Sequence, residues 1–105
     1  MQANEIQIER GNAVATVWLN RPTAYNALSE SVLAGLTDAF ESLGADRSVR
    51  VIVLAARGSA FCAGHDLKEM RAEPSDTYYQ QLFNRCTGVM NAIRSAPQPV
   101  IARVQ

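Results

Sequence analysis

The sequence lacks an excess of either charge and lacks long apolar runs. Ten basic residues balance ten acidic ones among 105 residues, so the composition indicates neither a nucleic-acid-binding surface nor a polybasic membrane anchor. No hydrophobic stretch approaches the length of a membrane span, and the first residues lack the basic and apolar regions of a signal peptide. We therefore expect a soluble protein with, by default, a cytoplasmic location.

Histidine, cysteine and lysine are all scarce. A single histidine cannot build a multi-histidine metal site, so we expect no metal. Two cysteines without a secretory context seldom pair, and we expect Cys62 and Cys86 to be free thiols. Cys62 has no identifiable base beside it and is interpreted as a small apolar residue rather than a nucleophile. Nine of the ten basic residues are arginine, and Lys68 is the only lysine.

The short motifs of common cofactor and nucleophile sites are also missing. The glycines do not fit G-x-G-x-x-G, no Gly-Lys-Ser/Thr sequence marks a phosphate loop, and no Gly-x-Ser-x-Gly elbow occurs. Dinucleotide, P-loop and serine-hydrolase interpretations therefore fail.

What the sequence does contain is an alternation of strands and helices. Residues 5–9 and 13–19 have strand patterns and predict an antiparallel hairpin that turns at Gly11-Asn12. After a loop, Ser29 is expected to cap a helix that ends at Gly44. The near-continuous apolar run 49–56 is typical of a strand in a parallel sheet.

The second half of the chain repeats this alternation. Asp66 and Glu69 have the spacing of a capping box, with Asp66 as the N-cap and Glu69 reaching back to it. A longer helix is expected to begin at 74–76, and its apolar residues are interpreted as core packing. These residues are Tyr79, Leu82, Phe83, Cys86, Val89, Met90 and Ile93. A further buried strand is expected from Pro99 onward. Because nothing in the sequence covers the second face of that strand, we expect an α/β domain that is incomplete at its C-terminus.

The stretch 57–67, Arg-Gly-Ser-Ala-Phe-Cys-Ala-Gly-His-Asp-Leu, is the candidate site. It joins a buried strand to a helix through small residues, where a glycine allows a sharp turn and a backbone amide can face a ligand. Such an amide stabilises negative charge on a carbonyl oxygen. An ordinary strand-to-helix loop explains the same residues, and the pattern alone leaves both interpretations open.

The order of several motifs resembles the first half of the enoyl-CoA hydratase/isomerase (crotonase) superfamily. The resemblance covers essentially the whole chain and rests on residues 19–22, 26–28, 51–54, 61–67 and 99–102. It implies the first ββα turns of a crotonase-like spiral, with residues 1–105 as the N-terminal part of one domain. It also implies an acyl-CoA thioester as substrate, no cofactor beyond the coenzyme A of that substrate, and a homotrimer or hexamer.

The resemblance implies a site residue by residue. The backbone amide of His65 would be one of two donors to a thioester enolate. The residues expected to bind substrate are Thr23, Ala24, Tyr25, Ala63, Gly64, His65, Asp66, Leu67 and Lys68. Thr23 stands where relatives often carry a basic residue. A contact with a coenzyme A phosphate is therefore expected from Arg21 or Lys68 instead. The second amide and the acid/base carboxylates of the family's hydratases come from elements beyond Gln105.

These implications favour the N-terminal half of a hydratase that adds water to a trans-2-enoyl-CoA, inactive as this segment alone. Other enolate reactions of the superfamily, double-bond isomerisation or thioester hydrolysis, are the alternatives within the family. A non-catalytic acyl-CoA-binding or assembly subunit is an alternative of another class. A small α/β module unrelated to coenzyme A is a third.

Overall fold

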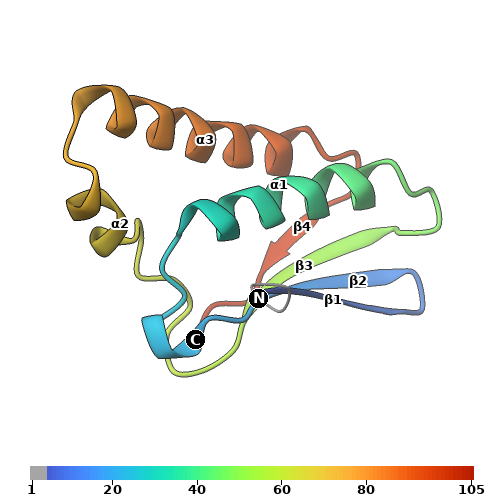
Figure 1. The fold of residues 1–105 in the computed structure, drawn as a ribbon. Helices are drawn as coiled ribbons and strands as arrows, with labels where there is room; N and C mark the ends of the chain where they lie inside the picture. The colour runs from blue at the N-terminus through green and yellow to red at the C-terminus, as the bar shows by residue number, and fades with distance from the viewer. Residues whose placement is uncertain (1–4) are drawn as a thin grey trace.

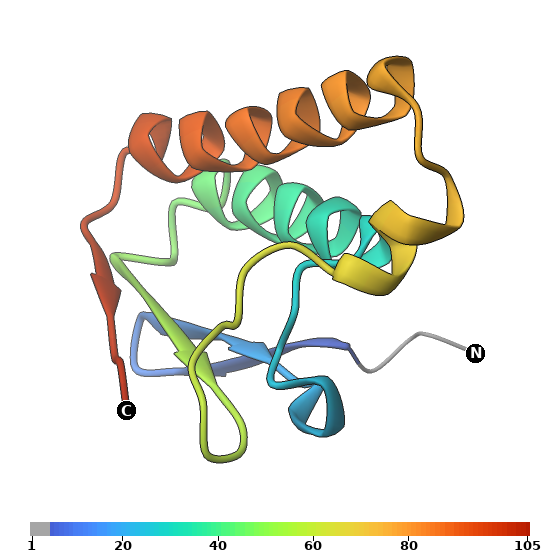
Figure 2. The ribbon, with the colours of Figure 1, turned by 90° about the vertical axis from the view of Figure 1, so that its left-hand side faces the viewer.

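The computed structural model describes residues 5–105 as one sheet with helices layered on it (Figures 1 and 2). Four strands lie in the order β1-β2-β3-β4; the first pair is antiparallel and the other two pairs are parallel. The predicted mixed α/β architecture is confirmed. The elements are β1 (Ile6–Gly11), β2 (Val14–Leu19), the 3-10 turn η1 (Pro22–Ala24), α1 (Glu30–Gly44), β3 (Val51–Ala56), α2 (Leu67–Ala72), α3 (Asp76–Ser95) and β4 (Val100–Ala102).

The β1–β2 hairpin turns one residue later than predicted. Asn12 and Ala13 have left-handed φ values of 52° and 67°, whereas Gly11 is the last residue of β1. Positive φ at both central residues is the type I′ geometry, whose twist matches that of the two strands. The Ala13 carbonyl accepts a hydrogen bond from the Arg50 amide at 2.7 Å, which ties the turn to the chain entering β3.

Helix α1 covers one face of the sheet and supplies six of the fifteen buried apolar residues that the structure describes, more than any other element. Ser29 caps it as predicted, because its hydroxyl accepts a hydrogen bond from the Val32 amide at 3.2 Å. The parallel register of β2 and β3 aligns alternate side chains of both strands toward this helix. The largest fully buried apolar side chains are Phe40, Leu33, Leu43, Ile52, Leu82, Val17, Val32 and Val89. Each contributes roughly 1.5–3 kcal/mol by burial.

Helix α3 lies on the outer side of α1, so these two helices are layered on the same side of the sheet (Figures 1 and 2). The predicted apolar stripe of α3 is core only in part, because Phe83 and Met90 are exposed. On the opposite face of the sheet, Ile101 is 54% exposed. The Trp18 ring on that face is covered by two guanidinium groups, those of Arg57 and Arg103, at 3.7 and 4.8 Å from the ring centroid.

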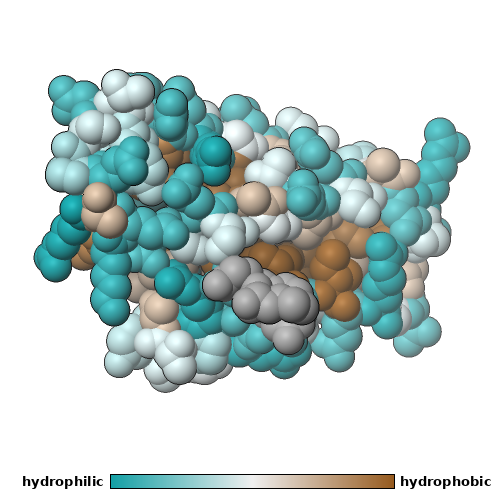
Figure 3. All heavy atoms as spheres, in the orientation of Figure 1, coloured by the Kyte–Doolittle hydropathy of each residue, from teal (hydrophilic) through white to brown (hydrophobic). Residues whose placement is uncertain are grey.

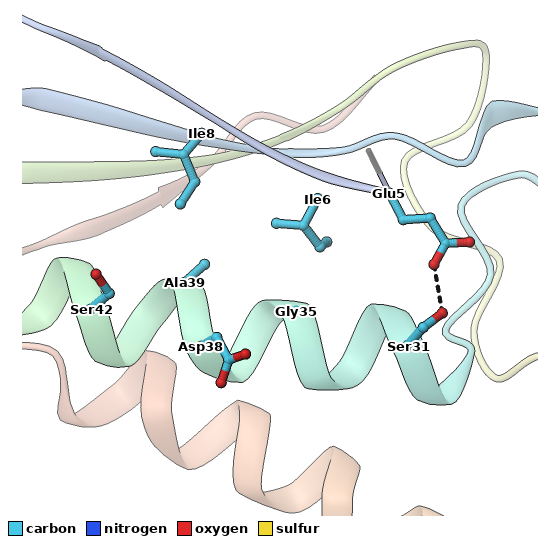
Figure 4. A pocket seen from close by; sticks show the side chains of 8 residues that line it. All are labelled: Glu5, Ile6, Ile8, Ser31, Gly35, Asp38, Ala39 and Ser42. Carbon is cyan, nitrogen blue, oxygen red and sulfur yellow. Dashed lines mark hydrogen bonds between the residues drawn. The ribbon is translucent and has the colours of Figure 1, made fainter. Parts of the chain in front are cut away.

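A groove of about 440 Å³ separates β1 from α1 at the open edge of the sheet (Figure 4). Ile6 and Ile8 point from β1 toward the helix (Figure 4). In the same region the surface shows a small hydrophobic patch surrounded by hydrophilic residues (Figure 3). A Cβ on Gly35 would lie 2.7 Å from Ile6 Cγ1, so the glycine allows strand and helix to approach here. The groove is therefore explained by packing at the edge of the core.

Candidate functional site

One buried side chain joins the turn after β3 to the loop after β2. Asn26 is only 1% exposed, and its Oδ1 accepts a hydrogen bond from the Arg21 amide at 2.7 Å. Its Nδ2 donates to the carbonyls of Arg57 and Ala60 at 2.8 and 2.9 Å. The φ of Asn26 is 55°, a left-handed value that asparagine tolerates better than most residues. The loop and the turn, neighbours in Figure 2, therefore form one unit.

A parallel bridge between Leu28 and His65 fixes the last part of the turn. The Leu28 amide donates to the Gly64 carbonyl at 2.7 Å, and the Leu28 carbonyl accepts from the Asp66 amide at 3.1 Å. In this pattern His65 directs its own N–H and C=O away from Leu28. Within residues 5–105, the His65 N–H has no hydrogen-bond partner. Gly64 has φ of 93°, a conformation in which a side chain is strained, so glycine is needed to deliver His65 in this direction.

Asp66 is the buried carboxylate of the site. Its Oδ1 accepts from the amides of Lys68 and Glu69 at 2.9 and 3.2 Å, which confirms its predicted role as the N-cap of α2. Its Oδ2 accepts from the Arg21 guanidinium at 2.8 Å, an ion pair that the sequence did not predict. Burial raises the pKa of Asp66, but the Arg21 hydrogen bond and charge and the two amides outweigh it, and the pKa is lowered from its usual value. Such a carboxylate is a poor general base.

Glu69 does not complete the predicted capping box. Instead of reaching back to Asp66, its Oε1 accepts a hydrogen bond from the amide of Glu30, the first residue of α1, at 2.9 Å. The reason is that the Asp66 amide already donates to the Leu28 carbonyl. Glu69 therefore satisfies one of the free amides at the start of α1 and fastens α2 to that helix.

A pocket of about 650 Å³ opens beside the turn, within the size range of small-molecule sites. Every predicted site residue except Tyr25 and Gly64 lines it. Tyr25 has its side chain outside the lining and is 59% exposed, although its carbonyl accepts from the Ala63 amide at 3.0 Å. The lining residues are Arg21, Thr23, Ala24, Ala27, Ala63, His65, Asp66, Leu67, Lys68, Met70 and Phe83.

The two cations of the pocket differ in how they are engaged. Arg21 pairs with Asp66 at 2.8 Å and with Glu5 at 3.4 Å, and it also donates to the Ala27 carbonyl. The exposed Lys68 ammonium forms no ion pair in the part of the chain that the structure describes. Lys68 is thus the cation left to meet an anion. Over the same residues there is no group of three or more possible metal ligands, and no helix that is long and apolar enough to cross a membrane.

Four residues of the site were not predicted as such: Ala27, Met70 and Phe83 in the lining of the pocket, and Asn26 behind the turn. Phe83 belongs to a stripe with helical spacing, and that spacing does not say how much of the stripe a neighbouring helix covers. It is 44% exposed, and its ring lies 5.3 Å from the His65 imidazole, centroid to centroid. Asn26 lies in one of the motifs of the resemblance, but its contacts join segments more than thirty residues apart in sequence. A local pattern carries no signal for them.

Comparisons with known proteins agree with one another. Residues 9–105 match the family described as enoyl-CoA hydratase/isomerase. The chain is 34% identical over 97 residues to enoyl-CoA hydratase domain-containing protein 3, mitochondrial, of Xenopus laevis, and 36% identical over 93 residues to the Homo sapiens protein of that name. These matches cover 92% and 89% of this chain but 33% and 31% of the relatives. The chain spans about a third of the length of these curated relatives.

Solved structures show the same fold. An enoyl-CoA hydratase of Mycobacterium smegmatis is 61% identical with a TM-score of 0.93, over 95% of this chain and 39% of that one. An enoyl-CoA hydratase/carnitine racemase from Magnetospirillum magneticum is 37% identical with a TM-score of 0.90, over 95% and 38% of the two chains.

Proposed function

Because the chain belongs to the enoyl-CoA hydratase/isomerase family, we propose that the pocket beside His65 binds an acyl-CoA thioester. In this proposal the His65 amide donates a hydrogen bond to the thioester oxygen as an enolate forms. The single observation behind it is the unpaired His65 N–H, which the hydrogen bonds of Leu28 hold in one direction. A donor that is already oriented needs no reorganisation when charge develops, and one such donor contributes about 3 kcal/mol to transition-state stabilisation.

The rest of the pocket suits the coenzyme. Ala63 and the segment 66–68 would line its path, with Gly64 keeping the backbone close, and Thr23, Ala24 and Tyr25 would flank its adenine end. The unpaired Lys68 ammonium would meet a phosphate as a point charge. Arg21 is better placed to hold Asp66 and the loop than to bind a phosphate, since two carboxylates already engage it.

The reaction we propose for the whole protein is hydration of a trans-2-enoyl-CoA. Both oxygens of Asp66 are occupied, by Arg21 and by two backbone amides, so Asp66 is not available for proton transfer. In this proposal the segment supplies the donor that stabilises the enolate, and carboxylates outside it carry out the proton transfers. Isomerisation of a double bond or hydrolysis of the thioester would use the same donor. A non-catalytic acyl-CoA-binding subunit would use the same pocket.

The test is an assay of the intact gene product for loss of enoyl-thioester absorbance over a series of acyl-chain lengths. Turnover supports hydration, while absence of turnover at every length overturns it. Migration of the double bond or release of free coenzyme A would assign one of the sister reactions. Acyl-CoA binding without any reaction would assign the binding subunit.

A pair of variants tests the donor itself. Gly64→Val forces a β-branched residue into a left-handed conformation and misdirects the next amide, so it should abolish acyl-CoA binding. His65→Ala keeps the backbone amide and should therefore lose much less of the acyl-CoA binding. If His65→Ala removed activity while the circular dichroism spectrum stayed native, the imidazole rather than the amide would be the essential group.

A further inference from the structure

Strand β1 has one edge without a partner in the part of the chain that the structure describes. It is the first strand of the sheet, and only β2 lies beside it. The hairpin register and the hydrogen bond from the Asn20 amide to the Glu5 carbonyl show that residues 5, 7, 9 and 11 direct their backbone groups to β2. The N–H and C=O groups of Ile6, Ile8 and Arg10 therefore point away from the sheet. Such a row of donors and acceptors is a template for another extended chain.

The side chains of Ile6 and Ile8 form one wall of the groove between β1 and α1 (Figure 4). The close approach of Ile6 to Gly35 gives the groove its floor, yet it leaves Ile8 43% exposed. Residues directly opposite each other on neighbouring strands point to the same face of a sheet. A chain paired with the free edge of β1 would therefore place every second side chain in the groove. There the small residues Gly35 and Ala39 of α1 leave room for it.

The charge of the groove indicates which side chains fit it. Asp38 lines the groove from α1, and its exposed carboxylate has no hydrogen bond or ion pair among residues 5–105. The other carboxylate of the lining, Glu5, already accepts from the Ser31 hydroxyl at 2.6 Å and pairs with Arg21 at 3.4 Å. The free charge of the groove is thus negative, and it favours a lysine or arginine side chain in the added strand.

A second copy of β1 fits the groove less well than a different chain does. Arg10 is the one basic residue of the strand, and its guanidinium is held by Asp46 of its own chain at 2.8 Å. Two paired β1 strands would also bring two Asp38 carboxylates to one shared groove, and juxtaposed like charges disfavour an interface. The charges therefore favour a basic partner over self-association.

We propose that the groove is a docking site for an extended segment of another protein, which adds a strand to β1 and carries a lysine or arginine two positions from an apolar residue. The spacing is two because alternate residues of a strand share one face. The apolar side chain packs on Ile8, and the cation pairs with Asp38. In this mode of recognition, main-chain hydrogen bonds give affinity and alternate side chains give specificity. The inference is independent of the acyl-CoA site, because no residue lines both pockets.

The experiment measures binding of fluorescein-labelled peptides to the intact gene product by fluorescence anisotropy. The probe is Thr-Val-Thr-Lys-Thr-Val-Thr, whose valine and lysine side chains share one face of a strand in either direction of pairing. Replacing its lysine with glutamate should weaken binding about fivefold, because attraction to Asp38 becomes repulsion. Methylating the interior backbone nitrogens of the probe should abolish binding, because the main-chain donors are then lost.

Three protein variants locate the binding to the groove. Ile8→Lys puts an inward-pointing charge on the edge strand and should abolish binding of the probe. Asp38→Asn should bring the affinities for the lysine and glutamate peptides to nearly the same value. Glu41→Gln is the matched control, because Glu41 is an exposed carboxylate on the same helix outside the groove, and the difference between the two peptides should survive.

Absence of binding of the lysine peptide to the wild-type protein would overturn the inference, and so would equal binding of the methylated peptide. Equal affinity of the wild-type protein for the lysine and glutamate peptides would remove the basic partner. If sedimentation velocity showed that Ile8→Lys dissociates an oligomer of the wild-type protein, the edge would belong to a second copy and the inference would fail. Because the peptide comparisons use the wild-type protein alone, they do not depend on whether every variant folds.

Discussion

The side chain of Asn26 should be worth more to stability than any other polar group of the loop. Replacing it with alanine removes three hydrogen bonds, from the Arg21 amide and to the Arg57 and Ala60 carbonyls. At about 1 kcal/mol each these account for roughly 3 kcal/mol. Alanine must also adopt the φ of 55°, which costs about 1 kcal/mol more. We therefore expect Asn26→Ala to lower the free energy of unfolding by about 3–5 kcal/mol.

Urea unfolding of the intact protein, followed by circular dichroism, measures this loss as a lower midpoint at constant slope. Asn26→Asp keeps the acceptor for the Arg21 amide but turns a carboxylate oxygen toward two carbonyls, so it should be at least as destabilising. Asn91→Ala on the exposed side of α3 is the control and should change stability by no more than about 0.5 kcal/mol. A loss below about 1 kcal/mol for Asn26→Ala would refute the reasoning, because buried carbonyls would then tolerate losing their donor.

Two further predictions concern the hairpin and the buried ion pair. Ala13→Gly removes the strain of a φ of 67° in the type I′ turn and should raise the free energy of unfolding by about 0.5–1 kcal/mol in the same urea assay; an unchanged or lower midpoint would contradict it. The pKa of Asp66 is lowered in the folded protein, so its contribution to stability is present above its usual pKa of about 4 and is lost as the pH falls through the folded-state value. Asp66→Asn should therefore flatten the plot of unfolding free energy against pH on its acid side, and an unaltered slope would contradict this.

The sequence predicted features that local patterns determine. The strands, the Ser29 and Asp66 caps and the end of α1 at Gly44 follow from alternation, capping chemistry and breaker residues, and the structure confirms them. The turn at Asn12-Ala13 was missed because glycine is the usual turn signal, whereas here Gly11 still pairs with Val14 in the sheet. Glu69 was assigned to the wrong helix because its spacing from Asp66 says nothing of the Leu28 carbonyl.

The sequence predicted which stretch of backbone forms the candidate site, but it did not predict the contacts that this stretch makes with distant elements. Seven of the nine residues expected to bind substrate line one pocket, which agrees with the resemblance in the order of the motifs. The Arg21–Asp66 ion pair and the Phe83 wall join residues from different elements, and no spacing in the sequence encodes such pairs. Whether the pocket binds coenzyme A stays a prediction.

The bridge between Leu28 and His65 has a consequence for how the site comes into being. Its hydrogen bonds, like the two that the Asn26 side chain donates, connect parts of the chain that are 31 or more residues apart. Closing loops of that length is an entropic cost that local structure cannot offset, and the parallel pairing of Val14 with Val51 closes a loop of the same length, so we expect these contacts to form together with the docking of β3 against β2. The direction of the His65 amide is then a property of the assembled sheet. An acyl-CoA ligand that needs this direction would bind only folded molecules and would raise the melting temperature, by an amount that keeps growing with the logarithm of the ligand concentration above the dissociation constant.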